Sequence, residues 1–161
     1  MLLTELGINA LFVYQKYPLK RHEECMCLLH EAGIYVLANI SAPSICVNRS
    51  APHQSCAPQL LDHYPATADT LTRFPNTLGL CVANELVNDV EALPARPVIR
   101  NVIQYLKSHM QDMLQMSKQR VVPLCINDPD FKSQSTDSLA YFTTQARESE
   151  SIDLYCFTAY N

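Results

Sequence analysis

The chain has 161 residues, of which 48% are hydrophobic and 17% charged, and its formal net charge is −4 at neutral pH. This length suits one domain with a buried core, and the composition excludes a disordered chain. The 12 basic residues are scattered, which argues against a nucleic-acid partner, because phosphate binding needs clustered Lys and Arg.

The first third of the chain predicts a strand, a helix and a second strand. Residues 8–14 form a short apolar run rich in strand-forming residues. Pro18 then opens a helical stretch whose apolar residues recur at helical spacing, and Gly33 ends it, because glycine accepts the left-handed conformation that follows a helix. Residues 34–40 form the second predicted strand, and a polar loop follows over 41–58.

The remaining elements continue the same alternation. A second helix covers 60–71 with Pro65 inside it, which costs about 3 kcal/mol unless the helix starts or kinks there. A strand over 78–83 runs into Asn84 and Glu85. Pro97 opens a long helix, a fourth strand covers 121–126, a short helix covers 139–142, and a fifth strand covers 152–157. One face of the long helix is apolar: Val98, Val102, Tyr105, Leu106, Met110 and Met113.

This order indicates an α/β fold with about five parallel strands. The strands are continuous apolar runs, as expected where helices cover both faces or enclose a barrel. Two architectures remain open: a doubly wound sheet, and part of a TIM (β/α)8 barrel, which needs eight such units. The chain has only three glycines and no glycine-rich phosphate loop, so we expect no nucleotide cofactor.

Seven cysteines are present. Three lie in apolar strand-like runs (Cys81, Cys125 and Cys156), and we expect them to be buried free thiols that pack as small hydrophobes. The other spacings, such as Cys25-Met26-Cys27, match no standard zinc site, so we predict no metal. Asn39-Ile40-Ser41 and Asn48-Arg49-Ser50 match the glycosylation sequon, a short pattern that is common by chance.

Polar side chains follow the predicted strands at their carboxyl ends, where ligands gather in both architectures. They are Tyr14, Gln15, Asn39, Ser41, Asn84, Glu85, Asn127, Asp128, Tyr160 and Asn161. Glu85 is the sharpest candidate, since a glutamic acid at such a mouth can protonate a leaving glycosidic oxygen and then deprotonate the incoming nucleophile. The alternative is a solvated loop carboxylate.

Several motifs resemble those of the fungal β-1,3-glucanosyltransferases, glycoside hydrolase family 72, in colinear order across nearly the whole chain. Residues 6–14 resemble the family's "LGINTIRVY", residues 22–36 its "HDECM…DAGIYV", and residues 41–49 its "SSPSTSINR". Residues 78–86 resemble "VLGFFAGNEV", residues 97–108 resemble "PFVKAAIRDMKQYIKS", Asn127-Asp128 resembles "SNDD", and residues 153–160 resemble "DFYGINMYEWC".

The resemblance implies cleavage of β-1,3-glucan and transfer of the new end to another glucan chain by a retaining double displacement. It makes Glu85 the acid/base and implies that five residues bind substrate: Tyr14, Asn84, Asn127, Asp128 and Tyr160. It also implies a glycoprotein at the cell surface, plasma membrane or wall, on a GPI anchor that these residues do not encode. Residues 1–5, by contrast, show no signal peptide, which taken alone suggests an intracellular protein.

The same resemblance predicts that residues 1–161 are an incomplete barrel that lacks the first strand and the last two. The family's nucleophilic glutamate follows the seventh strand, so no residue here takes that role, and we expect this fragment to be inactive. The family's arginine, aspartate and glycine near the site are Phe12, Asn39 and Ala83, and Cys25 matches a disulfide cysteine whose partner lies upstream.

Two other functions stay open. One is a non-catalytic glucan-binding or degenerate relative. The other is an unrelated doubly wound enzyme, against which the absence of a G-x-S-x-G elbow counts.

Overall fold

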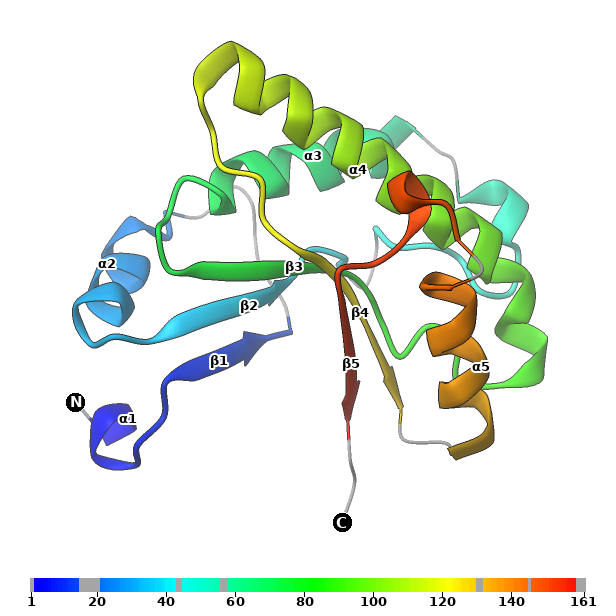
Figure 1. The fold of residues 1–161 in the computed structure, drawn as a ribbon, viewed down its shortest axis with the longest axis horizontal. Coiled ribbons are helices and arrows are strands. Elements are labelled where there is room, and N and C mark those ends of the chain that lie inside the picture. Colours follow the sequence, from blue (N-terminus) through cyan, green and yellow to red (C-terminus); the bar gives the residue numbers. More distant parts are fainter. Residues whose placement is uncertain are drawn as a thin grey trace.

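The computed structural model describes residues 2–14, 21–42, 45–55, 58–129, 132–144 and 146–158, and in them five strands form one parallel sheet (Figure 1). The strands are β1 (Ala10–Val13), β2 (Tyr35–Asn39), β3 (Thr77–Asn84), β4 (Leu124–Pro129) and β5 (Leu154–Thr158). The α-helices are α1 (Leu2–Glu5), α2 (Glu23–Glu31), α3 (Pro58–Leu71), α4 (Arg96–Ser117) and α5 (Lys132–Phe142). Short 3-10 turns are η1 (Pro52–Gln54), η2 (Val90–Ala95) and η3 (Glu148–Glu150).

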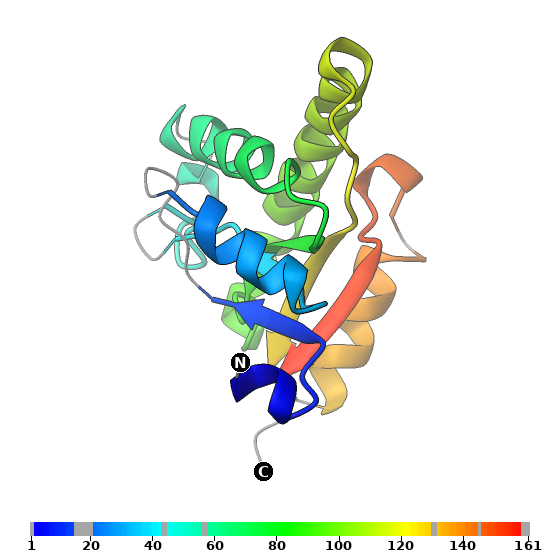
Figure 2. The same cartoon turned by 90° about the vertical axis from the view of Figure 1, so that its left-hand side faces the viewer.

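The order of the strands decides between the two predicted architectures. The sheet runs β1-β2-β3-β4-β5, each strand parallel to the next. A doubly wound sheet reverses its strand order at a switch point, whereas a (β/α) barrel adds strands in sequence. The sheet also curls, with α2, α3, α4 and α5 around its outer side (Figures 1 and 2). The partial barrel is therefore confirmed.

The outer face of the sheet and the helices around it share one apolar core. Leu80 pairs with Leu124 across β3 and β4, and both are fully buried together with Ile103 and Leu106 of α4. Of the six residues expected on the apolar face of α4, the three buried ones are Val102, Leu106 and Met110.

Pro65 lies inside α3 without ending it. A proline removes the N–H that would bond the carbonyl four residues earlier, here that of Leu61. In this fold the Tyr105 hydroxyl, from α4, donates to the Leu61 carbonyl over 3.4 Å. The neighbouring helix thus partly replaces the lost bond, and Tyr105, which was expected on the apolar face of α4, is 42% exposed.

Several element ends agree with the sequence, and others differ. Gly33 follows α2 with φ +70°, the left-handed conformation that was expected of it. The predicted start of this helix at Pro18 lies outside the described residues, and α2 begins at Glu23. α5 is longer than its apolar signal suggested, because its first two turns are polar and carry no periodicity.

The expectation of three free buried thiols was wrong for two of them. Cys81 and Cys125 are in register on β3 and β4, 4.4 Å apart at Cα, and form a disulfide. The sequence pattern showed two apolar strands but not that the two cysteines would be direct neighbours across them. Cys156 on β5 keeps a free, half-buried thiol, and Cys25 is an exposed free thiol. No helix of the described residues is both long and apolar enough to cross a membrane.

Candidate active site

Glu85 follows the last residue of β3, at the carboxyl edge of the sheet. Its φ is +49°, a left-handed conformation that few residues other than glycine adopt. Its backbone N–H donates to the carbonyl of Asn127 over 2.6 Å, which holds the residue against β4. A glutamate kept in a conformation that costs about 1–3 kcal/mol, at the ligand-binding edge of the sheet, is typical of a functional position.

An irregularity in β3 aims Asn84 at the inner face of the sheet. Cys81 pairs with Cys125 and Asn84 with Asn127, so three steps along β3 match two along β4. The register shift between Cys81 and Ala83 supplies the extra residue, as a β-bulge does. Without it Asn84 would face the opposite side from Cys81, because side chains alternate along a strand.

Three polar side chains meet on this inner face. The Asn127 amide donates through Nδ2 to Oδ1 of Asn84 over 2.8 Å and to the Thr158 hydroxyl over 2.8 Å. The three residues lie on β4, β3 and β5, so the network crosses three strands beside Glu85. Asn127 is 4% exposed and donates both hydrogen bonds, so it is the buried centre of this network. Thr158 is a site residue that the sequence did not single out, because the register of β5 was needed to place it.

Tyr14, Asn39 and Ser41 form the other wall of the site. The Asn39 amide donates to the backbone carbonyl of Tyr14 over 2.9 Å, and the Ser41 hydroxyl donates to Oδ1 of Asn39 over 2.9 Å. Tyr14 as a residue is 53% exposed, and its ring packs edge-to-face on that of Phe12, at 4.8 Å between centroids. Asn39 is thus buried and bonded within the fold, and of the two sequons only Asn48 is exposed.

A pocket of about 300 Å³ lies between these two walls. Its floor and sides are Tyr14, Asn39, Ser41, Ala42, Cys46, Val47, Tyr64, Val82, Ala83, Asn84 and Leu86. In the sequence, Glu85 stands between two of these lining residues, Asn84 and Leu86. Burial raises the pKa of the Cys46 thiol, and it raises that of Tyr64, whose hydroxyl donates to the Val82 carbonyl. None of these described lining residues is a carboxylate. Glu85, which directly follows the lining residue Asn84, is the neighbouring carboxylate in the sequence.

The expectation that Asp128 contacts the substrate stays a prediction, and the structure places this residue away from Asn84 and Asn127. Asp128 follows Asn127 on β4, so strand alternation turns it to the outer face, where it is 4% exposed. The Tyr155 hydroxyl donates to its carboxylate over 3.1 Å. Burial raises the pKa of Asp128, while bonds from Ser138 and Tyr155 and the charge of Arg96 act in the opposite direction. Asp128 therefore joins β4 and β5 to α5, behind the sheet.

The structure brings together four of the six predicted site residues at one edge of the sheet: Glu85, Asn84, Asn127 and Tyr14. Tyr160 lies outside the described residues. A glutamate and two amides at the carboxyl ends of barrel strands define a class of (β/α)-barrel proteins with a polar site at the barrel mouth.

Comparison with known proteins narrows this class. Residues 1–161 match the family model described as "Glucanosyltransferase", glycoside hydrolase family 72, and the chain belongs to that family. It is 32% identical over 148 residues to the 1,3-beta-glucanosyltransferase PGA5 of Candida albicans, covering 92% of this chain and 22% of that protein. It is 33% identical over 140 residues to GAS2 of Saccharomyces cerevisiae, covering 87% of this chain and 24% of that protein.

The fold agrees with solved structures of the same family. Saccharomyces cerevisiae Gas2p in complex with laminaritriose and laminaritetraose superposes with a TM-score of 0.73 at 29% identity, covering 96% of this chain and 34% of that one. The chain thus spans between about a fifth and a third of the length of these relatives.

Proposed function

We propose that these residues are the acid/base-bearing part of a β-1,3-glucan transglycosylase barrel. The observation that carries the proposal is the position of Glu85: strained at the end of β3, bonded to β4, and adjoining the amides of Asn84 and Asn127. In this function Glu85 protonates the leaving glycosidic oxygen, and then removes the proton from the acceptor glucan hydroxyl.

The neighbouring residues position the sugar. Asn84 adjoins Glu85, and an amide there is suited to bond a sugar hydroxyl, a contact that strengthens in an oxocarbenium-like transition state. Asn127 holds Asn84 in place, since its Nδ2 already donates to Asn84 and Thr158. The exposed Tyr14 ring offers a flat apolar surface to the face of a sugar. The bound oligosaccharides of Gas2p support β-1,3-glucan as the ligand class.

A retaining reaction needs a second carboxylate about 5–5.5 Å from the acid/base. The described lining of the pocket holds none, so we propose that residues 1–161 form part of a barrel whose first strand, last two strands and nucleophile lie outside them. We further propose a cell-surface or wall location and a glycolipid anchor, on family grounds. Release of the protein from cells by a phospholipase that cleaves such anchors would test the anchor.

The test is transfer between laminari-oligosaccharides by the natural protein that contains these residues, followed by product length. Glu85→Gln should lower transfer by about 10²–10⁴-fold, the usual contribution of general acid–base catalysis. Glu91→Gln is the matched control, because Glu91 is an exposed carboxylate in η2 and should leave transfer unchanged. Equal rates in the wild type and Glu85→Gln would refute the assigned role.

A non-catalytic glucan-binding role is the second candidate, favoured by the absence of a second carboxylate from the described pocket lining. Titration of laminaripentaose into the 161-residue chain, followed by NMR, separates the two. Binding without transfer by the natural protein supports the second candidate, and binding with transfer supports the first.

A further inference from the structure

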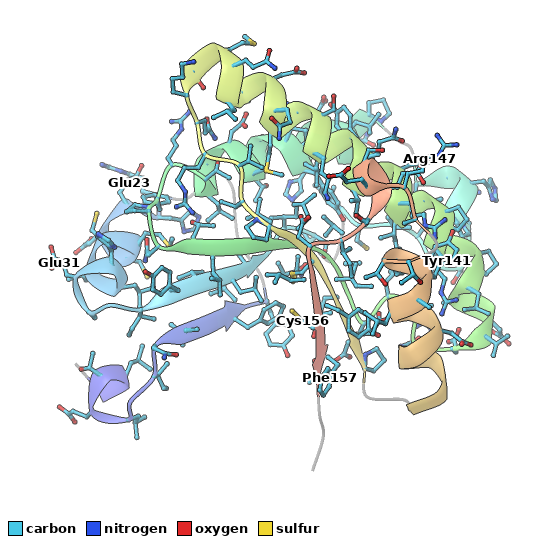
Figure 3. The ribbon with its side chains drawn as sticks, viewed as in Figure 1. Glu23, Glu31, Tyr141, Arg147, Cys156 and Phe157 are labelled. Atoms are coloured by element: carbon cyan, nitrogen blue, oxygen red, sulfur yellow. A yellow bond between two sulfur atoms is a disulfide. The ribbon has the colours of Figure 1, made fainter. Side chains whose placement is uncertain are left out.

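Three cysteine sulfurs meet on the inner face of the sheet, apart from the polar network. The Sγ atoms of Cys81, Cys125 and Cys156 all lie within 4.8 Å of one another. They come from three successive strands, β3, β4 and β5, and Figure 3 shows Cys156 midway along β5. The sequence separations of 44 and 31 residues hide this cluster, and only the register of the sheet reveals it.

The strand geometry explains why the three sulfurs share one face. Gly79 marks the inner face, because a Cβ there would meet the side chains of Leu37 and Leu154 from β2 and β5. Two residues along from Gly79 and Leu154, alternation places Cys81 and Cys156 on that same face. Cys125 joins them because it is the register partner of Cys81. The backbone therefore holds the three positions together whether or not the disulfide is formed.

We propose that, once the Cys81–Cys125 disulfide is reduced, Cys81, Cys125 and Cys156 bind one thiophilic cation of the Zn²⁺ type as a three-thiolate site. Thiolates are the ligands that such cations prefer. A Zn–S bond of about 2.3 Å places the sulfurs of a tetrahedral site about 3.8 Å apart. Two sulfurs of the disulfide have to separate and the third has to approach by at most about 1 Å, which side-chain rotation supplies.

The surroundings suit a cation with one open coordination position. Cys81 and Cys125 are fully buried, and Cys156 is half-buried, so Cys156 is the member of the cluster nearest to solvent. A cysteine binds such a cation as the thiolate, so the cation has to displace the proton of each thiol on binding. A divalent ion with three thiolates leaves a net charge of −1, which a bound water at the fourth position can solvate.

Formation of the cation site takes two steps, reduction of the disulfide and binding of the cation. A dithiol reductant gives two electrons and two protons to the disulfide, which becomes two thiols, while the reductant becomes a disulfide. The cation then replaces three thiol protons, which go to solvent. Oxidation reverses both steps and releases the ion, so occupation of the site depends on the redox state of one bond. This site does not depend on the proposed saccharide chemistry.

The experiment uses Cd²⁺ as the probe, because its thiolate complexes absorb in the ultraviolet. The four other cysteines are first replaced by serine to remove competing thiols: Cys25, Cys27, Cys46 and Cys56. Reduced under anaerobic conditions, this variant should bind one Cd²⁺ per chain, with the thiolate absorption of three sulfurs. The same variant with its disulfide intact should bind at least about 100-fold more weakly, because two of the three ligands are then withdrawn.

A second comparison tests the third ligand. Adding Cys156→Ser to the reduced variant should weaken Cd²⁺ binding by at least about 100-fold, with the circular dichroism spectrum retained. Equal affinity with and without Cys156, or no binding by a reduced chain that is still folded, would overturn the proposal. If Cys156→Ser does not fold, the reduced chain still decides the matter without that substitution, because thiolate absorption of only two sulfurs per Cd²⁺ would overturn the three-ligand site.

Discussion

The Cys81–Cys125 disulfide should contribute about 4 kcal/mol to the free energy of unfolding. Its cysteines are 44 residues apart in sequence, and the bond closes a loop of that length in the unfolded chain. The chain-entropy relation gives an entropy loss of about 13 cal/mol/K for such a loop, or about 4 kcal/mol at 25 °C. Since the two residues are direct register partners on adjacent strands, the native sheet keeps them together without the bond.

Urea unfolding of the oxidised and the reduced chain measures this contribution. The serine variant that lacks Cys25, Cys27, Cys46 and Cys56 is the right background, because it prevents other disulfides from forming in the unfolded state. The midpoint should fall on reduction, and the unfolding free energy with it, by about 4 kcal/mol. A difference below about 1 kcal/mol would refute the reasoning, since it would mean that the bond does not restrict the unfolded chain.

Three further predictions follow from single positions. Gly79→Ala should cost about 1–3 kcal/mol in a urea titration, because its Cβ would lie 2.9 Å from the backbone carbonyl oxygen of Pro123; a neutral effect would contradict the close approach. Glu85→Gly should raise the unfolding free energy by about 1 kcal/mol while abolishing transfer, because glycine adopts φ +49° without strain; a loss of stability would show that the side chain supports the fold. Burial raises the folded-state pKa of Asp128 above its ordinary value of 3.8, so the folded protein binds this proton more tightly than the unfolded chain does. The unfolding free energy should therefore fall as pH rises from about 4 through the raised pKa, and Asp128→Asn should remove that fall; identical pH profiles would refute it.

Most of the fold could be predicted from local patterns. The five apolar runs, the helix stop at Gly33 and the long helix after Pro97 each carry their own signal, and the structure has an element at each place. The choice between a barrel and a doubly wound sheet could not be made from those patterns, since both use the same alternation of strands and helices. The resemblance to family motifs made that choice, and the strand order confirmed it.

The site was less predictable, because it depends on register. Polar residues after each strand indicated the edge of the sheet at which Glu85, Asn84 and Asn127 lie together. Strand alternation, however, separates Asn127 from its neighbour Asp128, and a pattern of two adjacent polar residues does not show which one lies on the inner face of the sheet. Thr158 and the cluster of Cys81, Cys125 and Cys156 were missed for the same reason, since each depends on which residues of different strands lie opposite one another.

The extra residue in β3 divides the strand into a part before the register shift, up to Cys81, and a part after it, from Ala83. The lower part, before the shift, can change in sequence without changing the orientation of the upper part. Before the register shift, Leu80 and Cys81 are paired with Leu124 and Cys125 in the buried part of the sheet. After the shift, Asn84 is paired with Asn127, and the backbone N–H of Glu85 donates to the carbonyl of Asn127. A substitution in the lower part can therefore change the barrel interior while the orientation of the acid at the mouth is preserved. Deleting one residue between Cys81 and Ala83 would remove the register shift: Asn84 would then be the second residue after Cys81, and it would keep its pairing with Asn127 and its place on the inner face without a bulge.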